Sequence, residues 1–346
     1  MQLNTILKWG LSAGLLLVAL LLYDKYEVFY GPNVPSKLDT PYLYVPTGIT
    51  FDSLVVRLRE GGFIEDEAGF RETARWMEFD SKPTMRAGRF RIEPGWSNQQ
   101  LIRHLRGGKQ APVRLVLNNH RLLEDVAARC AQYLEPDSAA FARLFYDRAF
   151  LQTIGYTPET LMALFIPNTY EFFWNTTPEQ FLERMQREHE RFWSQNERLE
   201  KARALGLSPV EVYTLASIVE KETNRDDEKP RMAGVYLNRL RRNMLLQADP
   251  TAVFARRDFE TSRVTDFHTK FDSPYNTYKY PGLPPGPIYM ASIASIDAVL
   301  NAEKHDYLYF CARGDGSGYH SFAKTLRGHN QNVARYRRNL RNRRNG

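Results

Sequence analysis

Only two cysteines, Cys130 and Cys311, occur in this chain of 346 residues. That number excludes a small domain held together by disulfides and a Cys-rich zinc site. The seven histidines form no HExxH pair, so the sequence predicts neither a metal ion nor another cofactor. Acidic residues are missing from residues 335–346, which hold six arginines. Without these six charges the net charge of +7 falls to +1, so the basicity belongs to the tail and does not predict nucleic-acid binding.

Charge is also absent from the leucine-rich residues 10–23. Extended back to residue 6, with Lys8 reaching the interface, the stretch approaches the roughly 20 residues that a membrane-spanning helix needs. The chain continues as Tyr-Asp-Lys-Tyr at residues 23–26, which is no cleavage site of a signal peptide. We therefore predict a single-pass transmembrane anchor at residues 6–26, with a cleaved signal or a buried N-terminal helix as alternatives. The positive-inside rule places residues 1–5 in the cytoplasm.

A linker at residues 27–40 leads into a short unit that recurs and consists of a strand, a Pro/Gly turn and a capped helix. The copies place strands at 42–45 and 90–92 and helices at 50–59 and 97–105, and a weaker third copy places a strand at 114–117 and a helix at 122–133. The repetition predicts a small α+β module at residues 41–112. Because this module has no cluster of catalytic residue types, it is typical of a binding or spacer element.

Helices dominate residues 113–346, which we predict as a second, mostly helical domain of an α+β protein that ends in the basic tail. Thr177, followed by Pro, starts a helix that its apolar stripe extends to about Ala204. Ser208 starts the next helix with a capping box. Two strand-like runs around the Gly-rich residues 314–318 predict a β-hairpin.

The helix that begins after Ser208 carries two glutamates, Glu220 and Glu222, at the borders of its buried face. Counted at about 100° per residue from Val212, Glu220 lies at about +80° and Glu222 at about −80°. A carboxyl on such a border can be partly desolvated, which raises its pKa and suits a general acid. The periodicity does not choose between the two, and for an unselected helix glutamate a solvated structural role is the commoner one.

Three polar runs outside the regular elements predict a surface that binds sugars. Tyrosine rings can stack on sugar faces, and amides can hydrogen-bond to hydroxyl and acetamido groups, so these runs supply candidate substrate-binding residues. The candidates are Gln247, Asp249, Tyr275, Asn276, Tyr278, His320, His329 and Asn330. A helix cap, a Pro-stiffened surface loop and a plain hairpin are the structural alternatives.

Several motifs, in order along the chain, together carry a family resemblance. They are ASIVEKET at 216–223, VYLNRL at 235–240, LQADPT at 246–251, SPYNTY at 273–278, GLPPGPI at 282–288, and YLYF followed by H-x-F and by HN ending at residue 330. Over residues 165–330 the chain resembles the endolytic murein transglycosylase family (MltG, YceG-like). The predicted anchor and the recurring module are similar to that family's membrane span and LysM-like module.

The resemblance implies an enzyme, a lyase that cleaves nascent peptidoglycan glycan strands between N-acetylmuramic acid and N-acetylglucosamine and so terminates their elongation. It implies that Glu220 is the catalytic acid. One acid suffices because the 6-hydroxyl of the muramic acid attacks C1 in place of water and leaves a 1,6-anhydro end, without a metal or other cofactor. It also implies a catalytic domain in the periplasm, anchored in the inner membrane, with peptidoglycan synthases of the elongation machinery as partners.

The chain departs from the family pattern at several motif positions. The departures stand at 118–121, Asn168, Ala248, 289–292 and Gly328. They concern substrate contacts more than the acid. Two other functions stay open. One is a hydrolytic muramidase with Asp249 or Glu222 as its second carboxylate, and the other is a membrane-anchored, non-catalytic scaffold that binds glycan.

Overall fold

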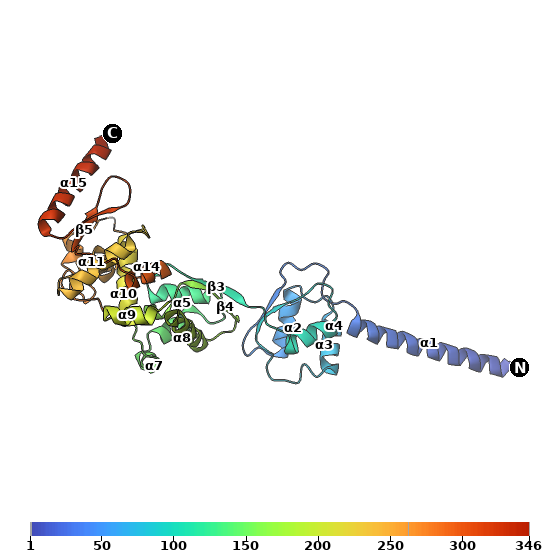
Figure 1. Cartoon of the computed structure of the whole chain (residues 1–346). Helices are drawn as coiled ribbons and strands as arrows, with labels where there is room; N and C mark the ends of the chain where they lie inside the picture. Colours follow the sequence, from blue (N-terminus) through green and yellow to red (C-terminus); the bar gives the residue numbers. More distant parts are fainter. Residues whose placement is uncertain (1, 262, 346) are drawn as a thin grey trace. The chain divides into compact units, whose positions relative to one another are not determined.

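The computed structural model describes residues 2–261 and 263–345 (Figure 1). The chain forms two compact units, each with its own hydrophobic core. Unit 1 runs to Arg114 and also includes residues 133–135 and 171–176, and unit 2 comprises residues 115–132, 136–170 and those from Thr177 onward. The described residues form a mostly helical α+β fold with three two-stranded sheets, which confirms the predicted α+β class.

Unit 1 is a small α+β module. Its elements are α1 (Gln2–Tyr30), β1 (Tyr42–Val45), α2 (Phe51–Glu60), α3 (Glu67–Trp76), β2 (Gly88–Arg91) and α4 (Asn98–Gly107). Strands β1 and β2 pair antiparallel, with Leu43 opposite Phe90. Both side chains are buried together with the apolar faces of α2 and α4, so sheet and helices share one core. The strands and helices predicted in this region are present, and α3 adds a helix that the repeat did not predict.

The two capped helices of unit 1 begin where the sequence predicts because a hydroxyl stands at each N-cap. The Thr50 hydroxyl accepts a hydrogen bond from the N–H of Ser53. Ser97 and Gln100 form a reciprocal capping box at the start of α4. Such a cap is worth about 1 kcal/mol, so a local signal in the sequence is enough to place each helix start.

The N-terminal helix α1 carries exposed leucines between residues 11 and 22. In the described part of the chain, no helix is both long enough and apolar enough to cross a membrane. The structure therefore does not bear out the transmembrane anchor predicted at residues 6–26. The uncharged stretch is short, and charged residues 24 and 25 follow it within the same helix. The side chains of residues 1–7, on which part of the prediction rests, lie outside the described part.

Unit 2 contains the remaining elements, apart from the ends of β3 and β4 that belong to unit 1. The elements are β3 (Val113–Leu117), α5 (Leu123–Ala131), α6 (Ser138–Phe145), α7 (Arg148–Thr153), the 3-10 helix η1 (Leu161–Leu164), β4 (Asn168–Phe172), α8 (Pro178–Ser194), α9 (Arg198–Leu205), α10 (Pro209–Glu222), α11 (Lys229–Arg241), α12 (Asp249–Arg256), α13 (Asp266–Thr269), α14 (Ile293–Leu300), β5 (Tyr309–Ala312), β6 (His320–Ala323) and α15 (Leu326–Asn345). Strand β3 pairs with β4, and β5 with β6. The strand, helix and hairpin predicted at 114–117, 122–133 and around 314–318 are thus present.

One predicted helix is interrupted. The helix expected over 177–204 ends as α8 at Ser194, and α9 restarts at Arg198. Between them Asn196 and Glu197 adopt left-handed conformations, with φ of 56° and 58°, which do not continue a right-handed helix. The buried guanidinium of Arg198 forms an ion pair with α14. A tertiary contact, which the periodicity of the sequence cannot reveal, therefore accompanies the change of chain direction between α8 and α9.

Helix α10 lies at the centre of the unit 2 core and positions the candidate acids. The capping box at Ser208 starts it where the sequence predicts. Every residue from Val212 to Val219 is buried, because α9, α11, α12 and α14 pack on this helix, and Figure 1 shows it among α9, α11 and α14. Its last turn, with Glu220, Lys221 and Glu222, is less buried.

Candidate active site

Glu220 is held where α10 meets α11 and α14. Its Oε2 accepts hydrogen bonds from the hydroxyls of Ser292 and Ser295 at the start of α14. The same oxygen lies 3.2 Å from Nζ of Lys229, the first residue of α11. The side chain of Glu220 is 18% exposed and that of Lys229 only 5%. This carboxyl therefore joins three helices and has little contact with solvent.

The surroundings of Glu220 favour its charged form. Burial acts to raise the pKa of this carboxyl, but the hydrogen bonds from Ser292 and Ser295 and the positive charge of Lys229 together outweigh burial, so the pKa is lowered. The position of Glu220 on the border of a buried face had led us to expect a raised pKa. A lowered pKa makes the protonated form, which a general acid needs, less populated.

Glu222, the last residue of α10, has the opposite electrostatics. Its Oε1 accepts a hydrogen bond of 2.6 Å from the hydroxyl of Tyr236, a buried residue of α11. Burial and the charge of Asp249 raise the pKa of Glu222 to about 7, although the Tyr236 bond and the charge of Arg239 act in the other direction. Near neutral pH this carboxyl is protonated in part of the molecules, so it can both donate and take up a proton.

A cavity of about 510 Å³ opens beside Glu222, and we call it the binding cavity. Five of the predicted substrate-binding residues line it together with Glu222: Gln247, Asp249, Tyr278, His320 and His329. They come from the start of α12, the loop after α13, the hairpin β5–β6 and the start of α15. Among the described residues Glu220 is not part of this lining. The structure thus gathers most of the predicted binding residues around the other glutamate of α10.

The polar side of the binding cavity is held by contacts between two of the predicted loops. The hydroxyl of Tyr278 donates to Oδ1 of Asp249 at 2.5 Å. The N–H of Gln247 donates to the carbonyl of Thr277 at 3.1 Å, and Gln247 itself adopts a left-handed φ of 49°. A non-glycine residue held in that conformation is strained and is often found at functional sites. Ala248, where the family often has Ser or Thr, is fully buried.

Three predicted binding residues lie outside the binding cavity. Asn276 is fully buried, and its Nδ2 donates to three backbone carbonyls within residues 268–271. Its amide therefore holds the loop together and is not available to a sugar. Tyr275 is half-buried against Phe254, with ring centroids 4.9 Å apart. Asn330 is exposed on α15. The positions of these three residues do not support a binding role.

Arg239 on α11 also lines the binding cavity and is not among the predicted binding residues. Its guanidinium donates to the carbonyls of Leu246 and Leu308 at 2.8 and 2.7 Å, and the residue is 7% exposed. It lies over the ring of Tyr309, which also stacks on His329 with ring centroids 5.4 Å apart. The sequence offers one signal for this residue, because Arg239 belongs to the VYLNRL motif. Buried arginines are rare unless they are paired.

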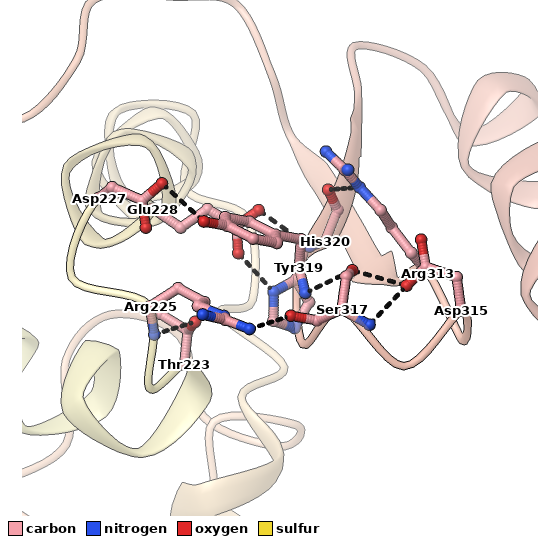
Figure 2. Close-up of polar contacts among 9 residues, drawn as sticks. All are labelled: Thr223, Arg225, Asp227, Glu228, Arg313, Asp315, Ser317, Tyr319 and His320. Carbon is pink, nitrogen blue, oxygen red and sulfur yellow. Dashed lines mark hydrogen bonds and ion pairs between the residues drawn. The ribbon is translucent and has the colours of Figure 1, made fainter.

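The hairpin that carries His320 is tied to the turn between α10 and α11 by the contacts drawn in Figure 2. The N–H of His320 donates to Glu228 at 2.9 Å, and its Nδ1 lies 2.8 Å from the second oxygen of that carboxyl. The hydroxyl of Tyr319 donates to Asp227 at 3.0 Å, and Arg225 donates to a carbonyl of the hairpin loop. Because Glu228 is 3% exposed, His320 is positioned by a buried group on the turn that follows Glu222.

The binding cavity offers carboxyls, imidazoles and a guanidinium for chemistry. Within residues 2–261 and 263–345, no group of three or more His, Cys, Asp and Glu side chains is arranged to hold a metal ion. Cys130 is buried and Cys311 is partly exposed, and both are free thiols. Burial raises the pKa of Cys130, which makes this thiol unreactive.

Several known proteins are similar to this chain. The model of the YceG-like family matches residues 43–335. An endolytic murein transglycosylase of Bacillus subtilis strain 168 is 26% identical over 313 residues, which cover 86% of this chain and 85% of the relative. One of Streptococcus pneumoniae serotype 2 strain D39 is 27% identical over 323 residues, which cover 84% of this chain and 57% of the relative. The crystal structure of a putative YceG-like protein from Listeria monocytogenes aligns with a TM-score of 0.56 at 27% identity and covers 84% of this chain and 97% of that one. This chain therefore belongs to the YceG-like family.

Proposed function

We propose that the protein is an endolytic lytic transglycosylase that cleaves peptidoglycan glycan strands between N-acetylmuramic acid and N-acetylglucosamine. The observation that carries this proposal is the binding cavity, which Glu222 lines together with five of the predicted sugar-binding residues. The B. subtilis and S. pneumoniae relatives bear the name endolytic murein transglycosylase, which supports this reaction class and a peptidoglycan substrate.

We propose Glu222 as the acid. Glu220, the acid that the family resemblance implies, is the alternative, and the Gln variants of the two residues decide between them. Glu222 borders the binding cavity and can be protonated near neutral pH. Glu220 is bound by two serine hydroxyls and Lys229, which lower the pKa of its carboxyl. In this proposal Glu220 stabilises the junction of α10, α11 and α14, and Glu222 performs the chemistry.

In the first step Glu222 donates its proton to the glycosidic oxygen as the bond from that oxygen to C1 of the muramic acid breaks. The electron pair stays with the oxygen, so the leaving strand ends in a free hydroxyl. C1 becomes positively charged and oxocarbenium-like. The exposed carboxylate of Asp249, whose charge already acts on Glu222, then stabilises the positive charge at C1.

In the second step the Glu222 carboxylate takes the proton of the 6-hydroxyl from the same muramic acid, and that oxygen closes on C1. The new bond forms the 1,6-anhydro end, Glu222 is protonated again, and no water is consumed. A pKa near the working pH suits this double role because the group must be an acid in one step and a base in the next.

A hydrolytic muramidase is the second candidate, because Asp249 is another carboxyl in the same cavity. Weighing the products of full-length protein incubated with purified glycan strands separates the two reactions. A 1,6-anhydro end is lighter by one water than a hydrolysed reducing end. Anhydro products from within the strands support the proposal, whereas hydrolysed ends would replace it with the muramidase. If no product forms, the glycan-binding scaffold is the remaining function.

We further propose that unit 2 works in the periplasm next to the inner membrane, because glycan strands are polymerised outside the cytoplasm. Peptidoglycan synthases of the elongation machinery are the partners that this location offers. Protease added to spheroplasts should digest unit 2 while it spares cytoplasmic proteins. Protection of unit 2 until the cells are lysed would refute the periplasmic location without touching the assignment of the acid.

A further inference from the structure

A second cavity, of about 260 Å³, shares Glu222 and Asp249 with the binding cavity. Two cations line it: Arg121, from the segment between β3 and α5, and Lys221, from the last turn of α10. Aromatic and aliphatic side chains, Phe259 among them, make up most of the remaining wall. We call this space the cationic cavity. The proposed mechanism uses neither of its two cations.

Aromatic rings hold both cations without neutralising them. The guanidinium carbon of Arg121 lies 4.3 Å from the ring centroid of Phe259, and Nζ of Lys221 lies 4.6 Å from that of Tyr289. Burial, and next the charge of Arg121, lower the pKa of Lys221, so the two cations are close enough to repel each other. Lys221 is exposed and Arg121 is half-buried, so both cations can reach an anion that enters the cavity from solvent.

The neighbouring acids are committed elsewhere. No ion pair within 4.0 Å involves Arg121 or Lys221 in the part of the chain that the structure describes. Asp125 accepts hydrogen bonds from the backbone N–H groups of Arg121 and of the next residue, and so caps α5. Glu220 is bound by two serines and Lys229. Asp249, which also lines this cavity, accepts the hydrogen bond of Tyr278. The two cations therefore face one carboxylate besides Glu222, and neither cation is held in an ion pair among the described residues.

We propose that the cationic cavity binds a carboxylate carried by the muramic acid whose C1 is attacked. This inference rests on the proposed function and names a feature of its substrate. Of the two sugars, only muramic acid bears a lactyl group, which ends either in a free carboxylate or in a stem peptide with carboxylates of its own. A carboxylate on a short apolar chain matches two cations beside Phe259. Binding it next to Glu222 selects the bond on the C1 side of muramic acid.

The test compares three forms of soluble glycan strands. The first form keeps its stem peptides. The second is stripped by an amidase, so that each lactyl group ends in a free carboxylate. The third is made from the first by treatment with carbodiimide and excess ammonia, which converts its carboxylates into amides. The variants are Arg121→Gln and Lys221→Met. Arg241→Gln is the matched control, because Arg241 is exposed on α11 and lines a different cavity.

Wild-type protein should cleave at least one charged form with a kcat/KM about tenfold above that of the amidated form, the factor expected for a hydrogen bond to a charged group. Arg121→Gln and Lys221→Met should each lose about tenfold on that charged form and change little on the amidated form. Preference for intact strands assigns the carboxylate to the stem peptide, and equal or better cleavage of stripped strands assigns it to the lactyl group.

Equal losses on charged and amidated strands, or no loss on charged strands, would overturn the inference. If wild-type protein cleaves no form, the proposed function fails, and the inference still has its own readout. Calorimetry then measures the affinity of the three forms for wild-type protein and for Arg121→Gln. An affinity independent of substrate charge would overturn the inference.

Discussion

The two sides of the last turn of α10 place their carboxyls in different electrostatic surroundings. On the side that meets α11 and α14, Glu220 receives two serine hydroxyls and an ammonium group, and its pKa is lowered. On the side that opens into the binding cavity, Glu222 receives one hydroxyl from Tyr236 and feels the negative charge of Asp249, and its pKa rises to about 7.

Burial raises the pKa of both carboxyls and is the largest influence on each. At Glu220 the hydrogen-bond donors and Lys229 outweigh it, whereas at Glu222 the donors do not. A buried carboxyl with enough donors is a structural anion, whereas one with too few donors and a neighbouring anion becomes an acid that titrates near neutral pH. When their environments push the pKa values of two carboxyls apart in this manner, the difference helps to assign their roles.

Replacing Glu222 with Gln should have the largest effect on activity. Gln keeps the shape and can still accept the hydrogen bond from Tyr236, but it has no proton to transfer. Cleavage of glycan strands should fall by at least roughly 10²–10⁴-fold, the usual contribution of a positioned acid–base group. Product formation by mass spectrometry measures it. Retention of more than a tenth of wild-type activity would return the choice of acid to Glu220.

Replacing Glu220 with Gln should act mainly on stability. Among the described residues it leaves the buried Lys229 with Asp226, 2.8 Å away, as its one charged partner, and should cost roughly 2–4 kcal/mol of unfolding free energy at pH 7. Urea denaturation measures the loss, with Glu222→Gln as the matched control. Because the pKa of Glu220 is lowered on folding, its stabilising effect is complete above its ordinary value of 4.5 and is lost as the pH falls below that. A difference independent of pH would contradict this account.

The pH dependence of cleavage should follow Glu222. The acid must carry a proton in the first step, so kcat/KM should fall as the pH rises through about 7, by about tenfold per pH unit well above it. Between 4.5 and about 7 the folded state also takes up a proton that the unfolded state does not hold. Wild-type protein should therefore lose stability relative to Glu222→Gln across this window as the pH rises. A rate that keeps increasing up to pH 9 would contradict the assignment.

The smallest effects should come from the loop at residues 273–287, where two neighbours have different roles. Tyr278→Phe removes the hydrogen bond to Asp249 and should lower cleavage several-fold while the melting temperature stays near that of wild type. Asn276→Ala removes three bonds to backbone carbonyls and should lower the unfolding free energy by about 1–3 kcal/mol. Measuring rate and melting on both variants separates the roles, and the reverse pattern would refute them.

Much of the fold was predictable because its signals are local. Thr50, Ser97 and Ser208 start their helices, as predicted, with hydrogen bonds to residues three positions away. The break after Ser194 was not predictable, because the apolar stripe continues through it and the left-handed residues 196 and 197 are not glycines. The contacts of Asn276 were not predictable for a related reason: its carbonyl partners are close in sequence, but the residue type does not determine the orientation of an amide in a loop.

The sequence by itself determined the α+β class, the order of the small elements, the family and the two glutamates at the end of α10, because capping residues, periodicity and motif order act over short distances along the chain. Only the tertiary structure decided which glutamate faces the binding cavity and which is held as an anion. Ser292 and Ser295 lie 72 and 75 positions from Glu220 in the sequence. A pKa depends on the charges and hydrogen-bond donors around a carboxyl, and these come together only when the chain has folded.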